Sequence, residues 1–219
     1  MKKDVCRKAR RTLLDHVELS GKRVLEVGCG EGNTTQSLIE CAREVVAIDP
    51  DFAALNKAKN NCLKASYVSC EGETLPFGNS SFDVVIFTYS LHHIPVPLMG
   101  QALKEASRVT RPKGKMAVLE PVGGGSFVEA WRMLKPYEDQ ERQAAQEALR
   151  KLEGWTVNDD VFFKVIFELE SVEEFRQQIC GQNEGEITDN LKKFLDDYKK
   201  DGEKIMLEAE RRMCILSRG

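Results

Sequence analysis

Short runs of valine, isoleucine and aromatic residues alternate with amphipathic stretches over the first 121 residues. The apolar runs are typical of buried strands, and their ranges are Lys22–Gly28, Glu44–Asp49, Ala65–Cys70, Phe82–Ser90 and Gly114–Pro121. Between them, apolar residues recur at helical spacing, as Leu98, Ala102 and Ala106 do. This alternation predicts a doubly wound α/β fold, in which helices cover both faces of a parallel sheet.

Three helix starts carry capping residues, whose side-chain oxygens accept hydrogen bonds from free backbone N–H groups. Asn33 and Asp51 each stand at the start of a helical stretch, and both are expected to be N-caps. Ser171, followed by Glu174, has the spacing of a capping box.

The alternation breaks after Pro121. The glycine triplet Gly123–Gly125 is followed by an amphipathic stretch. The next segment, Glu138–Gly154, carries many charges, which predict a solvated helix. Strands are expected at Asp160–Glu170 and at Arg212–Ser217, the latter closing an edge of the sheet. Ile187, Leu191, Phe194, Leu195 and Tyr198 form one apolar stripe of a further helix.

We expect residues 1–219 to form a single domain, in which residues 122–160 are an insert that covers the substrate. The glycine triplet would serve as its hinge. Apolar side chains that could line the substrate pocket are Trp131, Met133, Tyr137, Trp155, Phe162 and Phe163.

The composition is that of a globular protein. The 219 residues include 42% hydrophobic residues and carry a net charge of -3. No apolar run approaches the roughly 18 residues of a membrane span, and the charged N-terminus lacks a hydrophobic signal segment. We therefore expect no membrane span, and the slight acidity makes nucleic acid an unlikely partner. The basic cluster Arg7–Arg11 fits the solvated face of a helix.

The seven cysteines are odd in number and contain no CxxC pair. This usage argues against a disulfide framework and a cysteine-based metal site. It predicts reduced thiols and a cytoplasmic protein.

Three glycines, Gly28, Gly30 and Gly32, follow the first predicted strand. Alternating glycines allow a sharp turn and a close approach of a ligand to the backbone. The dinucleotide fingerprint GxGxxG fails here, because its last position holds Asn33. Glu26 and Glu31 also disfavour an anion, so we expect a ligand without phosphates that carries a positive centre.

Two further acids end the second and third predicted strands. Asp49 can accept hydrogen bonds from both hydroxyls of a ribose. Glu71 can accept one from an adenine amino group. Together with the glycine loop, these acids predict a nucleoside site at the carboxyl edge of the sheet, where doubly wound folds bind ligands.

The motifs VLEVGCGEG, VVAIDP, EGETLPFGNSSFDVVIFTYSLHHIP and EASRVTRPKGKMAVLEP occur in this order between Arg23 and Pro121. They resemble the class I S-adenosylmethionine-dependent methyltransferases, and more narrowly the group that contains the ubiquinone and menaquinone biosynthesis enzymes. The resemblance covers about half of the chain. It implies a Rossmann-like seven-stranded sheet of order 3-2-1-4-5-7-6 with the last strand antiparallel.

The resemblance also implies S-adenosyl-L-methionine as cofactor and S-adenosyl-L-homocysteine as product. Gly28, Cys29, Gly30 and Gly32 would border the methionine part, with Glu26 near its amino group. Asp49 would hold the ribose, and Pro50 or Phe52 would pack on the adenine. Further implied cofactor contacts are Glu71 and Gly72 at the adenine, and the backbone of Thr88 and Tyr89 at the methionine. The family often has aspartate at the position of Glu71, so this contact has a different geometry.

His92 and His93 lie in a loop that leaves the fourth predicted strand, beside the expected sulfonium. Methyl transfer needs a general base only if the nucleophile must lose a proton. Either histidine could orient the acceptor or accept its proton, and His93 is favoured. No metal site is expected, since adjacent histidines point apart.

The leading interpretation is a methyltransferase acting on a small-molecule acceptor. One alternative is a protein or tRNA methyltransferase, which would have a basic or grooved surface around Ser90–Pro95. A thiol-dependent metalloid methyltransferase would need cysteines near the pocket, where only Cys29 and Cys70 are expected. A different class of alternative is a non-catalytic methyltransferase-like binding subunit, and the presence of every cofactor residue argues against it.

Overall fold

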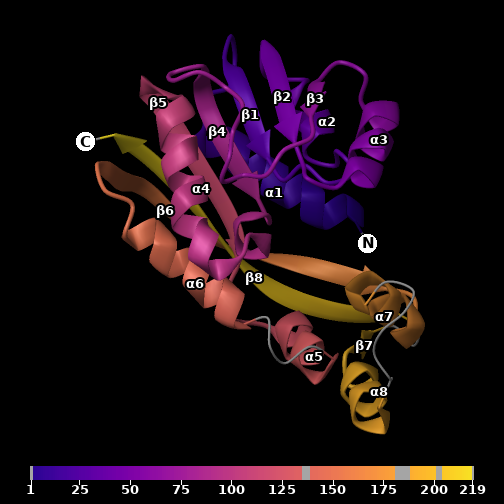
Figure 1. Cartoon of the computed structure of the whole chain (residues 1–219). Helices are drawn as coiled ribbons and strands as arrows, with labels where there is room; N and C mark the ends of the chain where they lie inside the picture. Colours follow the sequence, from indigo (N-terminus) through magenta and orange to yellow (C-terminus); the bar gives the residue numbers. More distant parts are fainter. Residues whose placement is uncertain (1, 135–138, 181–187, 201–203, 219) are drawn as a thin grey trace.

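The computed structural model describes residues 2–134, 139–180, 188–200 and 204–218 (Figure 1). Within these ranges the chain builds one mixed sheet. Its strands are β1 (Arg23–Val27), β2 (Glu44–Ile48), β3 (Ser66–Val68), β4 (Phe82–Thr88), β5 (Thr110–Pro121), β6 (Trp155–Leu169), β7 (Lys199–Lys200) and β8 (Lys204–Arg218).

The sheet has the order β3-β2-β1-β4-β5-β8-β6, with the two-residue β7 beside β8. The first five strands are parallel, and β8 runs antiparallel to both β5 and β6. The predicted order is confirmed, with β8 as the seventh long strand. The edge position expected for Arg212–Ser217 is wrong, because Cys214 lies opposite Val118 on one side and Asp160 on the other. The long pairing with β6 makes β6 the edge strand.

Helices cover both faces of the sheet. They are α1 (Lys2–His16), α2 (Thr35–Leu38), α3 (Phe52–Asn61), the 3-10 helix η1 (Leu91–His93), α4 (Val96–Val109), α5 (Ser126–Leu134), α6 (Asp139–Arg150), α7 (Val172–Cys180) and α8 (Asp189–Asp196). Residues of α1 and α2 share a core with one face of the sheet, and α4 and α6 share a core with the other. Figure 1 shows α4 and α6 side by side in front of the sheet.

The expected caps of α3 and α7 are confirmed. Asp51 accepts hydrogen bonds from the N–H groups of Ala53 (2.8 Å) and Ala54 (3.2 Å). Ser171 accepts one from the Glu174 N–H (3.1 Å), and the Glu174 carboxylate accepts one from the preceding backbone (2.8 Å). The N-cap expected at Asn33 is wrong, because the turn that follows the glycine loop extends to Thr34 and α2 begins only at Thr35.

The outer halves of β6 and β8 extend beyond the end of β5 and carry α5, α7 and α8 (Figure 1). We call this region the hairpin lobe. It has its own buried cluster, which contains Phe127, Phe167, Phe175, Leu191 and Leu195. The stripe predicted on this helix is confirmed at Leu191, Phe194 and Leu195. Tyr198 packs against the same cluster but lies beyond the end of α8, and Ile187 lies outside the described residues.

The charged helix predicted after Glu138 exists, but it is not simply a solvated helix. Ala145 and Leu149 of α6 are buried in the main core, and Arg142 is only 7% exposed. The helix packs against α4 and η1. Its alanines between charged residues are small enough to permit this close packing.

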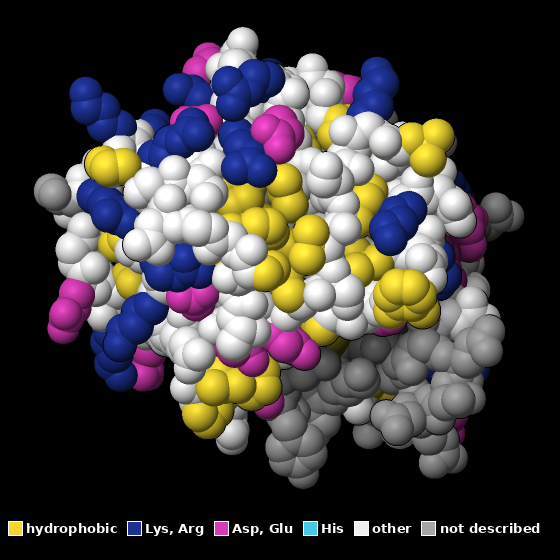
Figure 2. All heavy atoms as spheres, turned by 45° about the horizontal axis from the view of Figure 1, so that its top comes forward, with side chains coloured by type: hydrophobic (Ala, Val, Ile, Leu, Met, Phe, Trp, Pro, Cys, Tyr) yellow, Lys and Arg dark blue, Asp and Glu magenta, His cyan; other side chains and the backbone are white. Residues whose placement is uncertain are grey.

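Figure 2 looks onto the amino ends of the parallel strands, where lysine and arginine side chains are spread among acidic ones. This end of the sheet lies opposite the glycine loop. No helix in the described ranges is long and apolar enough to cross a membrane. The five cysteines whose side chains are described, Cys29, Cys41, Cys62, Cys70 and Cys214, are free thiols.

Candidate functional site

The glycine loop leaves β1 and turns against β2 and β4. Gly28, Gly30 and Gly32 all have positive φ, at 74°, 53° and 82°. A Cβ on Gly28 would stand 2.4 Å from the Ser90 Cβ, whereas one on Gly30 would meet nothing within 4 Å. The loop therefore needs Gly28 for packing, and it leaves open space at Gly30.

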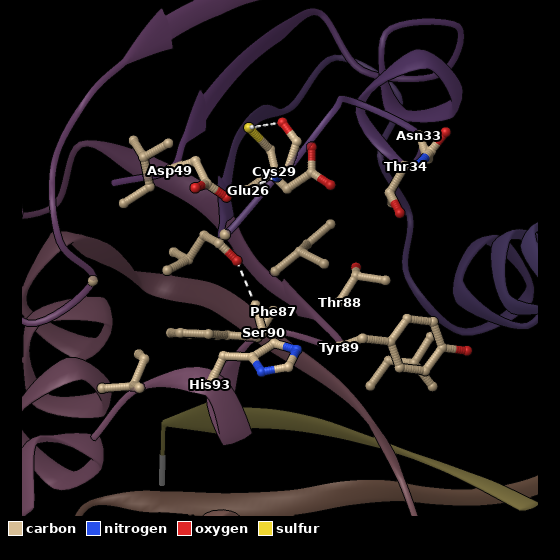
Figure 3. Close-up of a pocket in the computed structure, with 18 of the residues that line it drawn as sticks. Glu26, Cys29, Asn33, Thr34, Asp49, Phe87, Thr88, Tyr89, Ser90 and His93 are labelled. Atoms are coloured by element: carbon tan, nitrogen blue, oxygen red, sulfur yellow. Dashed lines mark hydrogen bonds between the residues drawn. The ribbon is translucent and has the colours of Figure 1, made fainter. Parts of the chain in front are cut away.

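Asp49 fastens this loop from the end of β2. Its Oδ2 accepts a hydrogen bond from the Gly30 N–H at 2.8 Å, and its Oδ1 accepts one from the Asp51 N–H at 2.9 Å. A carboxylate oxygen has more than one acceptor site, so both oxygens can accept a further hydrogen bond. The side chain is half-buried and faces the cavity (Figure 3).

Glu26 lies beneath the loop and is 1% exposed. Burial and, to a smaller extent, the charge of the nearby Asp49 raise its pKa from 4.5 to about 7. The Thr35 hydroxyl opposes this rise by donating a hydrogen bond to Oε2 at 2.5 Å. Burial and the two acids also raise the pKa of the Cys29 thiol, so this cysteine is not an activated nucleophile.

A cavity of about 500 Å³ opens at the carboxyl edge of the sheet (Figure 3). This volume lies within the usual range of small-molecule binding pockets. Of the residues predicted from the sequence, those that line it are Glu26, Gly28, Cys29, Gly30, Asp49, Pro50, Glu71, Gly72, Thr88, Tyr89 and His93. The cavity does not support the alternative of a thiol-dependent metalloid methyltransferase. Burial also raises the pKa of Cys70, the other cysteine on the wall, so neither thiol is activated.

Three predicted residues do not reach this cavity. Gly32 packs against Ala58 of α3, which a Cβ would approach to 3.1 Å. Phe52 is 63% exposed and lies beside Lys59 rather than on the cavity wall. His92 is buried and does not line the cavity, whereas His93, the favoured histidine, does.

One arm of the cavity extends between α1 and the sheet, and sequence reasoning missed it. Ala9, Arg10 and Leu13 of α1 face it, opposite sheet residues that include Ile86 and Leu119. Arg10 is held in an ion pair with Glu40. We call this part of the cavity the α1 arm. The residues that line it are Ala9, Arg10, Leu13, Thr34, Ser37, Ile86, Thr88, Tyr89, Ala117 and Leu119. In the sequence, the helical spacing of Ala9 and Leu13 could have indicated that one face of this helix packs toward the sheet and the cavity.

The two histidines of η1 play different structural parts. The His92 Nδ1 forms a short contact with Oε2 of Glu120, and the Glu120 Oε1 accepts a hydrogen bond from the Leu91 N–H at 2.9 Å. The His93 ring stands with its centroid 4.0 Å from that of His92 and faces the cavity (Figure 3). Glu120 and His92 thus fix the turn that presents His93.

The apolar residues expected to line a substrate pocket do not line this cavity. Trp131 packs in the hairpin lobe, and the Trp155 Nε1 donates a hydrogen bond to the Ser107 hydroxyl at 2.9 Å. Phe163 is half-buried against the core, while Met133 and Phe162 are exposed. Tyr137 lies outside the described residues. No described residue of 122–160 belongs to the cavity wall.

The sequence of this region matches a known family. Residues 24–114 match a family model described as a methyltransferase domain. The chain is similar to a demethylmenaquinone methyltransferase of Renibacterium salmoninarum, with 33% identity over 115 residues, 52% of this chain and 48% of the relative. The chain contains a class I S-adenosylmethionine-dependent methyltransferase domain.

Two further comparisons agree with this methyltransferase domain. A phthiotriol/phenolphthiotriol dimycocerosates methyltransferase of Mycobacterium ulcerans is 37% identical over 103 residues, 45% of this chain and 37% of the relative. A solved structure from Bacillus halodurans C-125 shares the fold with a TM-score of 0.68 at 18% identity, over 95% of this chain and 98% of its own. The chain spans about half the length, or less, of these curated relatives. The family implies S-adenosylmethionine as the cofactor.

Proposed function

We propose that this protein transfers a methyl group from S-adenosylmethionine to a small-molecule acceptor. The observation that carries the proposal is a single cavity that contains the glycine loop, Asp49, Glu71 and His93. The bound cofactor supplies the activated methyl group, and the protein supplies position and exclusion of water.

The residues present fit a nucleoside that carries an amino acid group. Glu26 is a buried acid suited to an ammonium group. Asp49 keeps acceptor capacity for ribose hydroxyls, and the open space at Gly30 admits a ligand against the backbone. Pro50, Glu71 and Gly72 would border the adenine, and Cys29, Thr88 and Tyr89 the methionine part. Gly32 would support the loop from its contact with α3.

We propose that the acceptor occupies the α1 arm. Its walls are largely apolar, and the names of the similar proteins given above refer to demethylmenaquinone and to phthiotriol/phenolphthiotriol dimycocerosates as acceptors. His93 would orient the acceptor or accept its proton at an imidazole nitrogen. The insert 122–160 would act indirectly, since α6 packs on η1 and so supports the turn that carries His93.

A cytoplasmic location is proposed as well, supported by the free thiols. The family's small-molecule acceptors and the slight acidity of the chain favour a small molecule over nucleic acid or protein.

The first experiment is calorimetric titration of the purified protein with S-adenosylmethionine, S-adenosylhomocysteine and, as control, NAD. Binding of the first two and none of NAD is expected, followed by methyl transfer in a screen of small nucleophiles. If neither S-adenosylmethionine nor S-adenosylhomocysteine binds, the result contradicts the proposal and favours a non-catalytic subunit.

A further inference from the structure

The outer edge of β6 is a long strand edge that no other described strand covers. β6 pairs with β8 on one side, and on the other side it ends the sheet. Every second residue of such a strand turns its backbone N–H and C=O groups outward, where they can pair with a further strand. The opposite edge of the sheet, β3, offers few such groups because it has only three residues.

The middle of this edge is apolar. Phe162 is 63% exposed, and Ile166, on the same face of the strand, is 48% exposed. On the other face, Val161 and Phe163 flank Phe162 and are only partly buried. Large apolar side chains gathered on an open strand edge are typical of a contact with another molecule.

Opposite charges lie at equal distances on either side of Phe162. Asp160 precedes it by two residues and Lys164 follows it by two, so all three side chains share a face. Asp160 accepts hydrogen bonds from Arg212 at 2.7 Å and 2.9 Å, and Lys164 pairs with Glu208 at 3.0 Å. Both side chains are exposed, so each can contact a further charge beyond the edge.

A second copy of β6, running antiparallel, matches this pattern. When Phe162 lies opposite the Phe162 of the second copy, Asp160 of each copy lies opposite Lys164 of the other. Val161 and Phe163 meet in the same way on the other face. Cross-strand pairs of aromatic residues and of opposite charges stabilise a sheet. Sliding one strand by two residues would place Phe162 opposite a charged side chain, and sliding it by four would place like charges opposite each other.

The central stretch of β6 lacks the features that prevent edge pairing. Such features include proline, bulges and lysine side chains. β6 contains no proline, and its register with β8 shifts only near its start, between Val157 and Asp159. Lys164 does not protect the edge against a second copy, because that copy presents Asp160 to it.

We propose that two copies of this chain form a dimer through antiparallel pairing of their β6 strands around Phe162. One sheet then continues through both copies, and Val161, Phe162 and Phe163 are removed from water. The inference concerns assembly, and it does not depend on the proposed function.

The first test is sedimentation velocity of the purified protein over a range of concentrations. We expect a dimer with a dissociation constant of about 10 µM or lower. A chain that stays monomeric up to about 100 µM overturns the proposal.

Phe162→Asp tests the centre of the interface. It should raise the dissociation constant at least about tenfold, because it places two like charges opposite each other. The matched control is Phe52→Asp. Phe52 is also 63% exposed, and it lies 5.9 Å from the Lys59 Nζ much as Phe162 lies 5.6 Å from the Arg212 Cζ. Figure 1 shows its helix α3 beside β2 and β3, at the opposite end of the sheet, so this variant should dimerise normally. A dimer that survives Phe162→Asp, or equal weakening by both substitutions, overturns the proposal.

A charge exchange tests the register. Asp160→Lys places two lysines opposite each other twice, and Lys164→Asp does the same with aspartates, so each variant alone should dimerise at least about tenfold more weakly. Mixing the two variants should restore the dimer, because every pair then joins opposite charges. A mixture that stays monomeric, or a single variant that dimerises like the original protein, overturns the proposal. Circular dichroism and denaturant unfolding check that each variant folds.

Cysteine cross-linking gives a second measurement that needs no change at Asp160. Under mild oxidation with copper phenanthroline, Phe162→Cys should form a disulfide between copies, since the two positions face each other. Lys164→Cys is the control, because its two copies lie about 13 Å apart along the strands. The original protein shows the background from its own cysteines. Equal cross-linking of both variants, or none above background, overturns the proposal.

Discussion

Asp49 links the glycine loop to the end of β2, and the proposed cofactor would use the same carboxylate. Its two oxygens accept hydrogen bonds from Gly30 and Asp51. A charged hydrogen bond to a desolvated ribose contributes roughly 1.5–3 kcal/mol. We therefore expect Asp49→Ala to weaken S-adenosylmethionine binding by about tenfold or more in calorimetry.

The matched control for Asp49 is Glu44→Ala. Glu44 is an acid at the opposite end of the same strand, exposed and paired with Arg23. Its removal should leave the affinity unchanged. If Asp49→Ala also binds normally, Asp49 does not belong to the cofactor site.

The raised pKa of Glu26 predicts that cofactor binding is coupled to the release of a proton. Burial raises its pKa from 4.5 to about 7, so in the free protein it is mostly protonated at a pH of about 6. A neighbouring ammonium group favours the carboxylate. Binding of S-adenosylmethionine should therefore release up to about one proton near pH 6 and little near pH 8.

Calorimetry in two buffers of different ionisation enthalpy measures this release, and Glu26→Gln should abolish it. Release of the same size by the Gln variant would sink the assignment. Because the folded pKa lies above the unfolded one, the same group stabilises the free protein below about pH 4.5, and this contribution is lost as the pH rises through about 7.

Residues that end predicted strands could be found from the sequence, and residues that meet them by tertiary pairing could not. Asp49 and Glu71 follow apolar runs, so their place at one edge of a parallel sheet follows from the strand pattern. Thr35, Glu120 and Arg211 have no such local signal. Arg211 approaches Tyr89 only because β8 pairs with β5, 90 positions or more away in the chain.

At the level of elements, the glycine loop and the start of η1 depend on one close contact. A Cβ at Gly28 would lie 2.4 Å from the Ser90 Cβ, and Ser90 donates a hydrogen bond to the Val27 carbonyl at 2.5 Å. Gly28→Ala should therefore push β4 and the loop apart. We expect a loss of about 2 kcal/mol or more in the free energy of unfolding and at least about tenfold weaker cofactor binding.

Gly21→Ala is the control for backbone strain alone. Gly21 has a φ of 70°, close to the 74° of Gly28, but a Cβ at this position would meet no atom within 4 Å. The substitution should cost about 1 kcal/mol and leave cofactor affinity unchanged. Denaturant unfolding and calorimetry measure both effects. Equal losses in the two variants would show that the contact with Ser90 is unimportant.

The strands were predicted correctly where an apolar run in the sequence coincides with a buried segment of the sheet. The five apolar runs all contain parallel strands. For β1, β2, β4 and β5 the reason is that strands covered on both faces need continuous apolar sequence, whereas β3 is a short, partly exposed edge strand. Two errors concern neighbours that periodicity cannot reveal. The short α2 begins only after the turn containing Asn33, and β8 is internal because β6 pairs along almost its whole length.

At the scale of the whole molecule, the sheet order followed from the family resemblance, whereas the hairpin lobe was not expected. Its core is formed by residues separated by a long stretch of chain, such as Phe127 of α5 and Leu195 of α8. Phe127 stacks on Phe167 with ring centroids 3.8 Å apart. No single segment contains a pattern that specifies this packing.

The separate cores predict that stability and cofactor binding can be altered independently. Phe87 and Phe175 are both fully buried, but Phe87 lines the cavity and Phe175 belongs to the hairpin lobe. Replacing either by alanine should cost about 3–5 kcal/mol in denaturant unfolding. Only Phe87→Ala should weaken S-adenosylhomocysteine binding, because Phe175 does not border the cavity. Phe175→Leu and Phe87→Leu provide milder versions of the same comparison if an alanine variant does not fold. Equal weakening of binding by both substitutions would mean that the hairpin lobe and the cavity respond as one cooperative unit.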